Sequence, residues 1–291
     1  MISVIIRTFN EERYLPELLQ GIQRQSVGQP VEVLVVDSGS TDQTRSIASE
    51  YGCQIVEIKK SEFTFGRSLN LGCAAAQGEI LVFISGHCVP FDDHWLMALT
   101  RPFQDSTVGV AYGRQVGGPD TRFTEHQIFA KYFPDHAQPS QVGFFCNNAN
   151  SAVRRSLWKR FGYDESLTGL EDMHFGKRTV AAGFSVQYAH QAAVYHFHHE
   201  SWGQIQRRFE REAMALQDIM PAVQLGLIDA FRYTIAGICS DFGVALGQKG
   251  LWRELISIVR YRICQYRGAW KGHHRHRKLS ARERERYFYP R

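Results

Sequence analysis

The amino-acid sequence predicts an α/β fold with a mainly parallel central sheet, followed by a helical C-terminal region. Up to residue 115, short apolar runs of strand length alternate with segments whose apolar residues recur at helical spacing. Strands that alternate with helices form βαβ units, whose parallel strands are covered by helices on both faces. This rhythm stops after residue 115, and the chain beyond residue 220 has helical patterns. We therefore expect two domains, residues 1–220 and residues 221–291.

The order of the elements follows from the residues. The apolar run 2–6 predicts the first strand, and Asn10 is placed to cap the helix that follows it. In that helix Leu15, Leu19 and Ile22 recur at helical spacing. Further strands are expected at 31–36, 54–58, 79–85, 108–113 and 184–196. Helices are expected through residue 51, after Asp93, and at 68–76, 154–161, 170–183, 201–218 and 251–267, with an irregular excursion at 117–145.

The composition is that of an ordinary globular protein. Of 291 residues, 44% are hydrophobic and 22% are charged, which excludes a disordered chain, a collagen and a polytopic membrane protein. The apolar segment 222–247 is interrupted by Asp229, Arg232 and Asp241, which excludes a bilayer span. The six cysteines include no C-x-x-C pair, and the first apolar run is too short for a signal peptide. We therefore expect a reduced, cytosolic protein.

Charge is distributed unevenly along the chain. Residues 253–291 hold 12 Lys and Arg against three Glu, a net charge of +9, whereas the remainder of the chain has a net charge of −4. A basic end on an acidic body predicts an anionic partner, and the alternative is a solvated tail. No nucleic-acid-binding motif accompanies the cations, so we expect no nucleic acid. The apolar stripe of Leu255, Val259 and Ile263 favours an anionic membrane surface instead.

Polar residues follow three of the predicted strands. In open parallel sheets, ligands bind beyond the carboxyl ends of the strands. The segments at these ends are Arg7–Asn10, Asp37–Asp42 and Ser85–Cys88. Asp37, followed by a Ser-Gly-Ser-Thr turn, suits ribose hydroxyls or a base, and the alternative is a residue that only shapes the turn. The chain has neither a G-x-G-x-x-G fingerprint nor a P-loop.

Six stretches in a fixed order resemble the family 2 glycosyltransferases, which have the GT-A fold and transfer sugars from nucleotide donors with inversion. The stretches are ISVIIRTFNEERYLPELL, VEVLVVDSGSTDQT, GRSLNLGCAAAQGEILVFISGHCVP, NNANSAVRRSLW, GLEDMHFGKRTVAAG and VYHFHHES, and together they cover roughly residues 2–200. The DSGSTD turn and the RTFNEE start are most similar to the bacterial branch that includes rhamnosyltransferase-like enzymes.

The resemblance implies roles for the donor-site residues. Thr8, Asn10 and Glu12 would line the nucleobase pocket. Asp37 would hold the base or the ribose. The residues that would face the nucleotide or its diphosphate are Arg67, Asn70, Ser85 and His87.

The stretch GLEDMHF carries the implied catalytic residues. In this family the second acid of a Glu-Asp pair at a helix start deprotonates the acceptor hydroxyl, which implies that Asp172 is the general base and Glu171 its neighbour at the acceptor or sugar. The alternative is an acid that only complements the helix dipole.

The metal site departs from the family. Ser85-Gly86-His87 replaces the aspartate-x-aspartate signature that offers oxygen ligands to Mg²⁺ or Mn²⁺. An imidazole is a poor Mg²⁺ ligand, although Mn²⁺ accepts one, so the replacement argues against an ordinary Mg²⁺ cofactor. The implied metal ligands are His87, His196 and His198. The alternative is a metal-free site in which arginines of the following helix neutralise the diphosphate.

These features predict an inverting glycosyltransferase that moves a sugar from a nucleoside diphosphate to a glycan or lipid-linked acceptor in cell-surface polysaccharide synthesis. We expect it in the cytoplasm, peripheral on the inner face of the cell membrane. The replaced signature leaves a second hypothesis, a non-catalytic nucleotide-sugar-binding or scaffold protein derived from such enzymes. A nucleotidyltransferase is disfavoured, because the first loop lacks the Gly-rich, lysine-bearing sequence expected for a triphosphate.

Overall fold

The structure is a computed structural model, and it describes residues 1–138, 143–247 and 251–275. The chain forms two compact units. The sheet unit comprises Met1–Gly118, Tyr132–Ser166 and Glu171–Phe197. The helical unit comprises Pro119–Lys131, Leu167–Leu170 and the chain from His198 onward.

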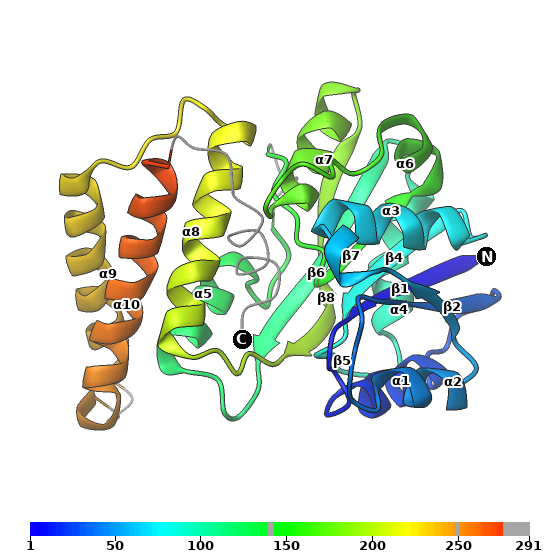
Figure 1. Ribbon diagram of the computed structural model, residues 1–291, viewed down its shortest axis with the longest axis horizontal. Helices are drawn as coiled ribbons and strands as arrows, with labels where there is room; N and C mark the ends of the chain where they lie inside the picture. The colour runs from blue at the N-terminus through cyan, green and yellow to red at the C-terminus, as the bar shows by residue number, and fades with distance from the viewer. Residues whose placement is uncertain (139–142, 248–250, 276–291) are drawn as a thin grey trace. The chain divides into compact units, whose positions relative to one another are not determined.

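The sheet unit is built on one eight-stranded sheet with the strand order β3-β2-β1-β4-β7-β6-β8-β5 (Figure 1). The strands are β1 (Ile2–Thr8), β2 (Val31–Asp37), β3 (Gln54–Glu57), β4 (Ile80–Ser85), β5 (Cys88–Pro90), β6 (Val108–Gly117), β7 (Asn150–Arg154) and β8 (Ser185–His196). The four strands β3, β2, β1 and β4 are parallel, as are β6 and β8. β7 runs antiparallel to both of its neighbours, and β5 runs antiparallel to β8.

The register of the parallel strands gathers their carboxyl ends at one edge. Thr8 lies opposite Asp37, and Arg7 lies opposite Ser85. The polar residues that follow β1, β2 and β4 are therefore neighbours in space, as the sequence predicted. The predicted α/β class with a mainly parallel sheet is confirmed.

Helices cover both faces of this sheet. They are α1 (Leu15–Gln23), α2 (Thr44–Glu50), α3 (Phe65–Ala75), α4 (Trp95–Thr100), α6 (Arg155–Phe161) and α7 (Glu171–Ala181), with short 3-10 turns at Lys60–Glu62 and Arg101–Gln104. Alternate residues of β1, such as Val4 and Ile6, form one buried core with the apolar faces of α1 and α4. On the other face α3 packs closely on β1 at Gly72. A Cβ at this position would lie 2.6 Å from Cγ2 of Ile5, so the close approach requires glycine.

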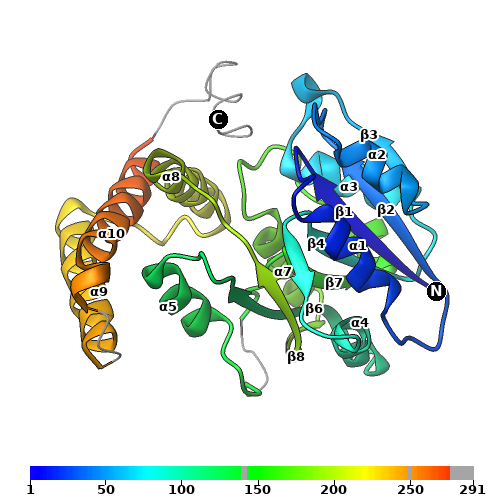
Figure 2. The ribbon, with the colours of Figure 1, turned by 90° about the horizontal axis from the view of Figure 1, so that it is seen from below.

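The helical unit consists of α5 (Phe123–Tyr132, all but its last residue), α8 (Trp202–Ile219), α9 (Leu227–Gly247) and α10 (Leu251–His273). α10 packs against both α8 and α9 and lies between them (Figures 1 and 2). The hydroxyl of Thr124 in α5 donates to Asp241 in α9 at 2.8 Å. Asp241 also accepts from Arg262 of α10 at 2.7 Å, so a buried ion pair ties the last two helices together.

Two sequence predictions need correction. Asn10 does not cap α1, because its backbone has a φ of 57° and the N-cap position belongs to Tyr14. The excursion at 117–145 contains a regular helix, α5. In α10 the buried face is formed by Ile258 and Tyr261. Leu255 and Val259 are half-buried and Ile263 is exposed, so the predicted apolar stripe lies away from this buried face.

The domain boundary expected at residue 220 differs from the boundary between the two compact units, which lies at residue 198 in this part of the chain. α8 packs with α10 and belongs to the helical unit, although its residues precede 220. A boundary between folding domains at residue 220 stays a prediction. The part of the basic tail from residue 276 to residue 291 lies outside the described residues. Among the described helices, none combines the length and the apolar character needed to cross a membrane.

Candidate active site

The first site residues lie at the adjoining ends of β1 and β2. Asp37 is 1% exposed and accepts hydrogen bonds from the hydroxyl of Thr8 at 3.0 Å and from the backbone N–H groups of Gly39 and Ser40 at 3.1 and 2.9 Å. The Ser40 hydroxyl donates to the same carboxylate. In this conformation Asp37 shapes the turn after β2, which was the alternative that the sequence left open. Its predicted contact with a nucleotide stays a prediction.

The loop after β1 is joined to the loop after β2 by a series of hydrogen bonds. The backbone N–H of Asn10 donates to Ser40 Oγ at 2.9 Å, and Asn10 Oδ1 accepts from the N–H of Thr41 at 2.8 Å. The carboxylate of Glu12 accepts from the N–H of Gln43 at 3.0 Å. Asn10 and Glu12 are both exposed, as residues lining a ligand pocket would be.

Two further predicted donor residues, Arg67 and Asn70, belong to α3. The amide of Asn70 makes four hydrogen bonds, to both backbone groups of Tyr163 and to the side chains of Trp158 and Glu165. Arg67 forms an ion pair with Glu165 at 3.6 Å. The structure brings both residues into contact with segment 158–165. Their predicted role facing the nucleotide stays a prediction.

The acidic pair predicted for catalysis begins α7. Glu171 is 5% exposed, and its carboxylate pairs with the guanidinium of Arg7 in β1 at 3.1 Å. Asp172 is 8% exposed and accepts hydrogen bonds from the N–H groups of Asn148 at 2.9 Å and Met173 at 2.7 Å. Glu171 is thus paired with a cation, whereas Asp172 has only neutral hydrogen-bond donors.

This difference in surroundings sets the protonation of Asp172. Burial raises the pKa of Asp172, the negative charge of Glu171 raises it further, and together they bring it to about 7 against the opposing hydrogen bonds and the charge of Arg7. A carboxyl group with such a pKa exchanges protons near neutral pH. General base catalysis is most efficient when the pKa of the base lies near the working pH.

The replaced metal signature is supported by a carboxylate from a different loop. His87 lies in the turn between β4 and β5, and its Nδ1 is 2.7 Å from Oε1 of Glu11. Gly86 makes room for this contact, since a Cβ there would lie 2.8 Å from Cγ of Glu11. Ser85 ends β4, and its N–H donates to the carbonyl of Ala149 at 3.3 Å.

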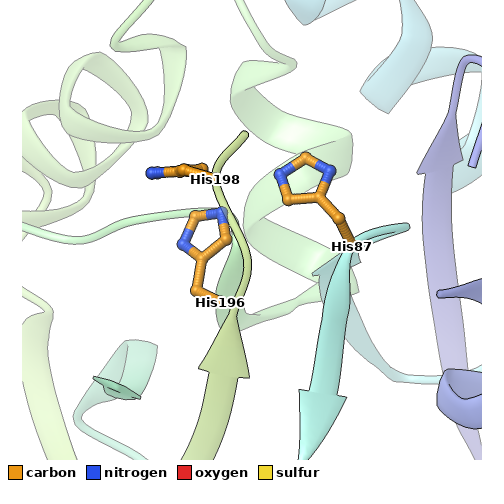
Figure 3. Close-up of side chains that lie close together, drawn as sticks. All are labelled: His87, His196 and His198. Atoms are coloured by element: carbon orange, nitrogen blue, oxygen red, sulfur yellow. The ribbon is translucent and has the colours of Figure 1, made fainter. Parts of the chain in front are cut away.

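His196 faces His87 from the neighbouring strand β8, and Figure 3 shows the two rings. Their centroids are 5.0 Å apart with an interplanar angle of 20°. Nδ1 of His196 lies 2.7 Å from Oε1 of Gln115 in β6, which fixes the ring orientation. The third predicted ligand, His198, belongs to the helical unit. There its Nδ1 contacts Oε1 of Glu125 at 2.7 Å.

The ligand atoms of a site determine which metal ions it binds well. His87 and His196 offer imidazole nitrogens, and the Glu11 carboxylate on the far nitrogen of His87 is the partner that metal-binding histidines usually have. This set fits Mn²⁺ or a softer ion better than Mg²⁺. In the helical unit, Glu125, His198 and Glu200 also lie together, but Arg208 bonds to both carboxylates at 3.0 and 2.7 Å. That second group is an ion-pair network.

Sequence reasoning missed three residues that the structure adds to the site. Glu11 contacts His87, although its neighbour Glu12 was the residue chosen from the sequence. Arg7 pairs with Glu171, and an arginine within a buried strand was itself a signal for an acidic partner. Gln115 orients His196, and no sequence pattern pointed to it.

The sequence of the chain matches a known family. Residues 3–162 match the profile of Glycosyl transferase family 2, which is more than half of the chain. The chain belongs to glycosyl transferase family 2. The O-antigen chain rhamnosyltransferase WbaN of Salmonella anatum is 30% identical over 210 residues, 67% of this chain and 66% of that protein. The O-antigen chain rhamnosyltransferase RfbN of Salmonella typhimurium is 28% identical over 68% of this chain and 66% of its own length. The match spans just under two thirds of either relative.

Solved structures share the fold at low identity. The mannosyltransferase PcManGT from Pyrobaculum calidifontis, solved with GDP-Man and Mn²⁺, has a TM-score of 0.66 at 17% identity, covering 93% of this chain and 86% of that one. S. aureus TarS 1-349, solved with UDP, has a TM-score of 0.54 at 21% identity, covering 80% and 69%. These findings confirm the predicted family and the GT-A fold, and two of the relatives are O-antigen chain rhamnosyltransferases, the kind of relative that the sequence predicted.

Proposed function

We propose that this chain is an active inverting glycosyltransferase in which Asp172 is the general base. The observation that carries the proposal is the paired environment of Glu171 and Asp172: one carboxylate is neutralised by Arg7, while burial and the neighbouring charge raise the pKa of the other to about 7. An acid that only complemented the dipole of α7 would have a lowered pKa instead. This feature favours the enzyme over the non-catalytic scaffold.

In the proposed reaction, a carboxylate oxygen of Asp172 accepts the proton of the acceptor hydroxyl. The acceptor oxygen then bonds to the anomeric carbon as the bond from that carbon to the diphosphate oxygen breaks, and the nucleoside diphosphate leaves with the electron pair. The N–H groups of Asn148 and Met173 hold the Asp172 carboxylate in place for this transfer. Arg7 fixes Glu171 beside it, where Glu171 contacts the acceptor or the donor sugar.

We propose that the donor, a nucleoside-diphosphate sugar, binds at the carboxyl ends of β1, β2 and β4. Two observations support this: ligands in open α/β sheets bind at that edge, and solved neighbours with this fold hold GDP-Man, UDP or UDP-GlcNAc. The residues proposed to line the pocket are Thr8, Asn10, Glu12, Asp37 and Ser85, and Arg67 and Asn70 are proposed to face the nucleotide.

His87 and His196 would hold a divalent ion at the diphosphate. Such an ion neutralises the negative charge of the leaving group when it is bound. PcManGT and a glucosyl-3-phosphoglycerate synthase were solved with Mn²⁺, which supports this choice of ion. Glu11 is proposed to hold the ring of His87 by its Nδ1 atom and to leave Nε2 directed toward the ligand.

The acceptor is proposed to be a glycan or lipid-linked saccharide of a cell-surface polysaccharide. The named function of WbaN and RfbN, O-antigen chain rhamnosyltransferases, supports this choice. We place the protein in the cytoplasm at the inner face of the cell membrane, where an anionic membrane surface is its second partner. The net charge of +9 over residues 253–291 supports that surface.

A ligand screen followed by turnover tests the proposal. Thermal unfolding is measured with a panel of nucleoside diphosphates and their sugars, with and without Mn²⁺, since a ligand at 100 times its dissociation constant stabilises by about 2.7 kcal/mol. The stabilising sugar nucleotide is then incubated with wild type, Asp172→Asn and the control Asp120→Asn, which changes an exposed side chain. We expect hydrolysis or transfer by wild type and the control. Donor binding without turnover in all three proteins supports the scaffold hypothesis.

A further inference from the structure

The exposed face of α10 combines large apolar side chains with arginines. Trp252 is 88% exposed, Ile256 is 78% exposed and Ile263 is 47% exposed. Arg260 and Arg267 are exposed as well, and the five residues recur at spacings of four, four, three and four. They therefore form one stripe along the helix, opposite the buried Ile258 and Tyr261.

A groove of about 420 Å³ runs along this stripe beside α8. Its lining residues are Gln206, Leu255, Ile256, Val259, Arg260, Ile263, Cys264 and Arg267. The lining is mainly apolar, and its charged members are two arginines. A ligand that suits it has an apolar chain and an anionic group.

The exposed face of α9 is mainly apolar. Ile228 is 75% exposed, Phe231 is 67% exposed and Leu246 is 65% exposed, and Ile235 lies on the same face at helical spacing. The exposed charges nearby, Asp229 and Arg232, lie 3.9 Å apart and offset each other. Soluble monomers rarely expose apolar patches of this extent, and such a patch marks an interaction site.

We propose that the exposed faces of α9 and α10 bind the surface of an anionic lipid leaflet. The apolar side chains enter the boundary between headgroups and acyl chains, and Arg260 and Arg267 reach the lipid phosphates. The inference names the surface by which the chain meets the membrane partner proposed above. It does not depend on transferase activity, because vesicle binding is measured without donor or acceptor.

The charges on the stripe favour a membrane over a second copy of the chain. In a symmetric dimer the same patch faces itself, so Arg260 and Arg267 of both copies would enter one interface. Among the described residues of α10, Glu254 is the one acid, and it lies on the opposite side of the helix from these arginines. An anionic leaflet supplies phosphates to every arginine at once.

Co-sedimentation with vesicles tests the proposal. The full chain is mixed with vesicles of phosphatidylcholine alone or with phosphatidylglycerol, and the pelleted fraction is measured. We expect binding to the anionic vesicles and at least tenfold weaker binding by Phe231→Ser/Ile256→Ser. Arg267→Gln should bind about fivefold more weakly, since one cation near the leaflet is worth about 1 kcal/mol, and binding should weaken in 1 M salt. Met97→Ser and Arg24→Gln, which change exposed residues of the sheet unit, should bind as wild type does.

Thermal unfolding of each variant shows that loss of binding is not loss of fold. Three results overturn the proposal: equal binding to neutral and anionic vesicles, binding to neither, or variants that bind as wild type does. Light scattering measures whether the protein is a monomer or a dimer in solution. If the protein binds no vesicle and forms a dimer that Ile256→Ser dissociates, the exposed faces of α9 and α10 bind a second copy of the chain. That result overturns the membrane assignment.

Discussion

Oε1 of Glu11 lies 2.7 Å from Nδ1 of His87, so a carboxylate in the loop after β1 supports a histidine in the turn after β4. The two residues are separated by 76 positions in the chain and meet because β1 and β4 are neighbouring parallel strands. This contact fixes the orientation of the His87 ring.

Glu11→Ala should weaken Mn²⁺ binding by about 10–100-fold, the usual effect of removing the partner of a metal-binding histidine. Calorimetric titration of Mn²⁺ into the protein with a nucleoside diphosphate measures the affinity directly. Glu17→Ala, an exposed acid in α1, is the control and should leave the affinity unchanged. An unchanged affinity in the Glu11 variant would show that the contact with His87 is not part of the ion site.

Metal dependence should differ from that of an ordinary Mg²⁺ enzyme. Because His87 and His196 offer nitrogen donors, we expect transfer to survive chelation in part, or Mn²⁺ to restore it better than Mg²⁺ does. Transfer rates after EDTA treatment and metal addition provide the measurement. Complete loss followed by full recovery with Mg²⁺ would contradict the prediction and would indicate oxygen ligands, with Asp92 and Asp93 as the candidates.

Asp172→Asn should lower the transfer rate by about two to four orders of magnitude, because general base assistance is worth that factor. Donor affinity should be retained, since the variant changes only one atom of a group placed beside the acceptor. Single-turnover rates and calorimetric donor binding separate the two effects. A variant that transfers sugar at the wild-type rate would remove Asp172 from the role of base.

The same substitution should stabilise the fold above neutral pH. Asp172 has a pKa of about 7 in the folded chain and near 3.9 when unfolded, so between these values the folded state binds the extra proton and stability falls as pH rises. Asp172→Asn removes this loss. We expect a higher unfolding temperature for the variant at pH 8 and a much smaller difference at pH 4. Equal differences at both pH values would contradict the raised pKa.

Asp37→Ala should affect both the turn and the donor. It leaves the Thr8 and Ser40 hydroxyls and two backbone N–H groups without their acceptor. Each donor left unsatisfied in a buried position lowers the stability of the fold by about 1–3 kcal/mol. If Asp37 also binds the nucleotide, affinity falls by about 1.5–3 kcal/mol. Ser40→Ala perturbs the turn but keeps the carboxylate. Calorimetry on both variants therefore tells whether Asp37 contacts the nucleotide, and equal affinities in both would assign it to the turn alone.

Much of the fold followed from local sequence patterns. The apolar runs of β1, β2 and β4 and the helical spacing in α1 and α8 specify these elements by burial of one face, which short-range periodicity records. The cap assigned to Asn10 was wrong because a different interaction decided its backbone: its side chain accepts from Thr41, 31 residues away. The local sequence pattern around Asn10 could not show this hydrogen bond, because its donor lies in a distant part of the chain.

Some features of the candidate site also followed from the sequence, and others depended on the tertiary structure. The sequence by itself determined the family, the acidic pair at the start of α7 and the replacement at Ser85 and His87, because these are identities of residues in a fixed order. Only the tertiary structure decided that Arg7 pairs with Glu171, that Glu11 supports His87 and that Arg67 and Asn70 bond to segment 158–165. Such contacts depend on strand order and register, which bring distant residues to one edge of the sheet. Burial then sets the charge of Asp172, and burial is a property of the packed molecule that no single stretch of sequence contains.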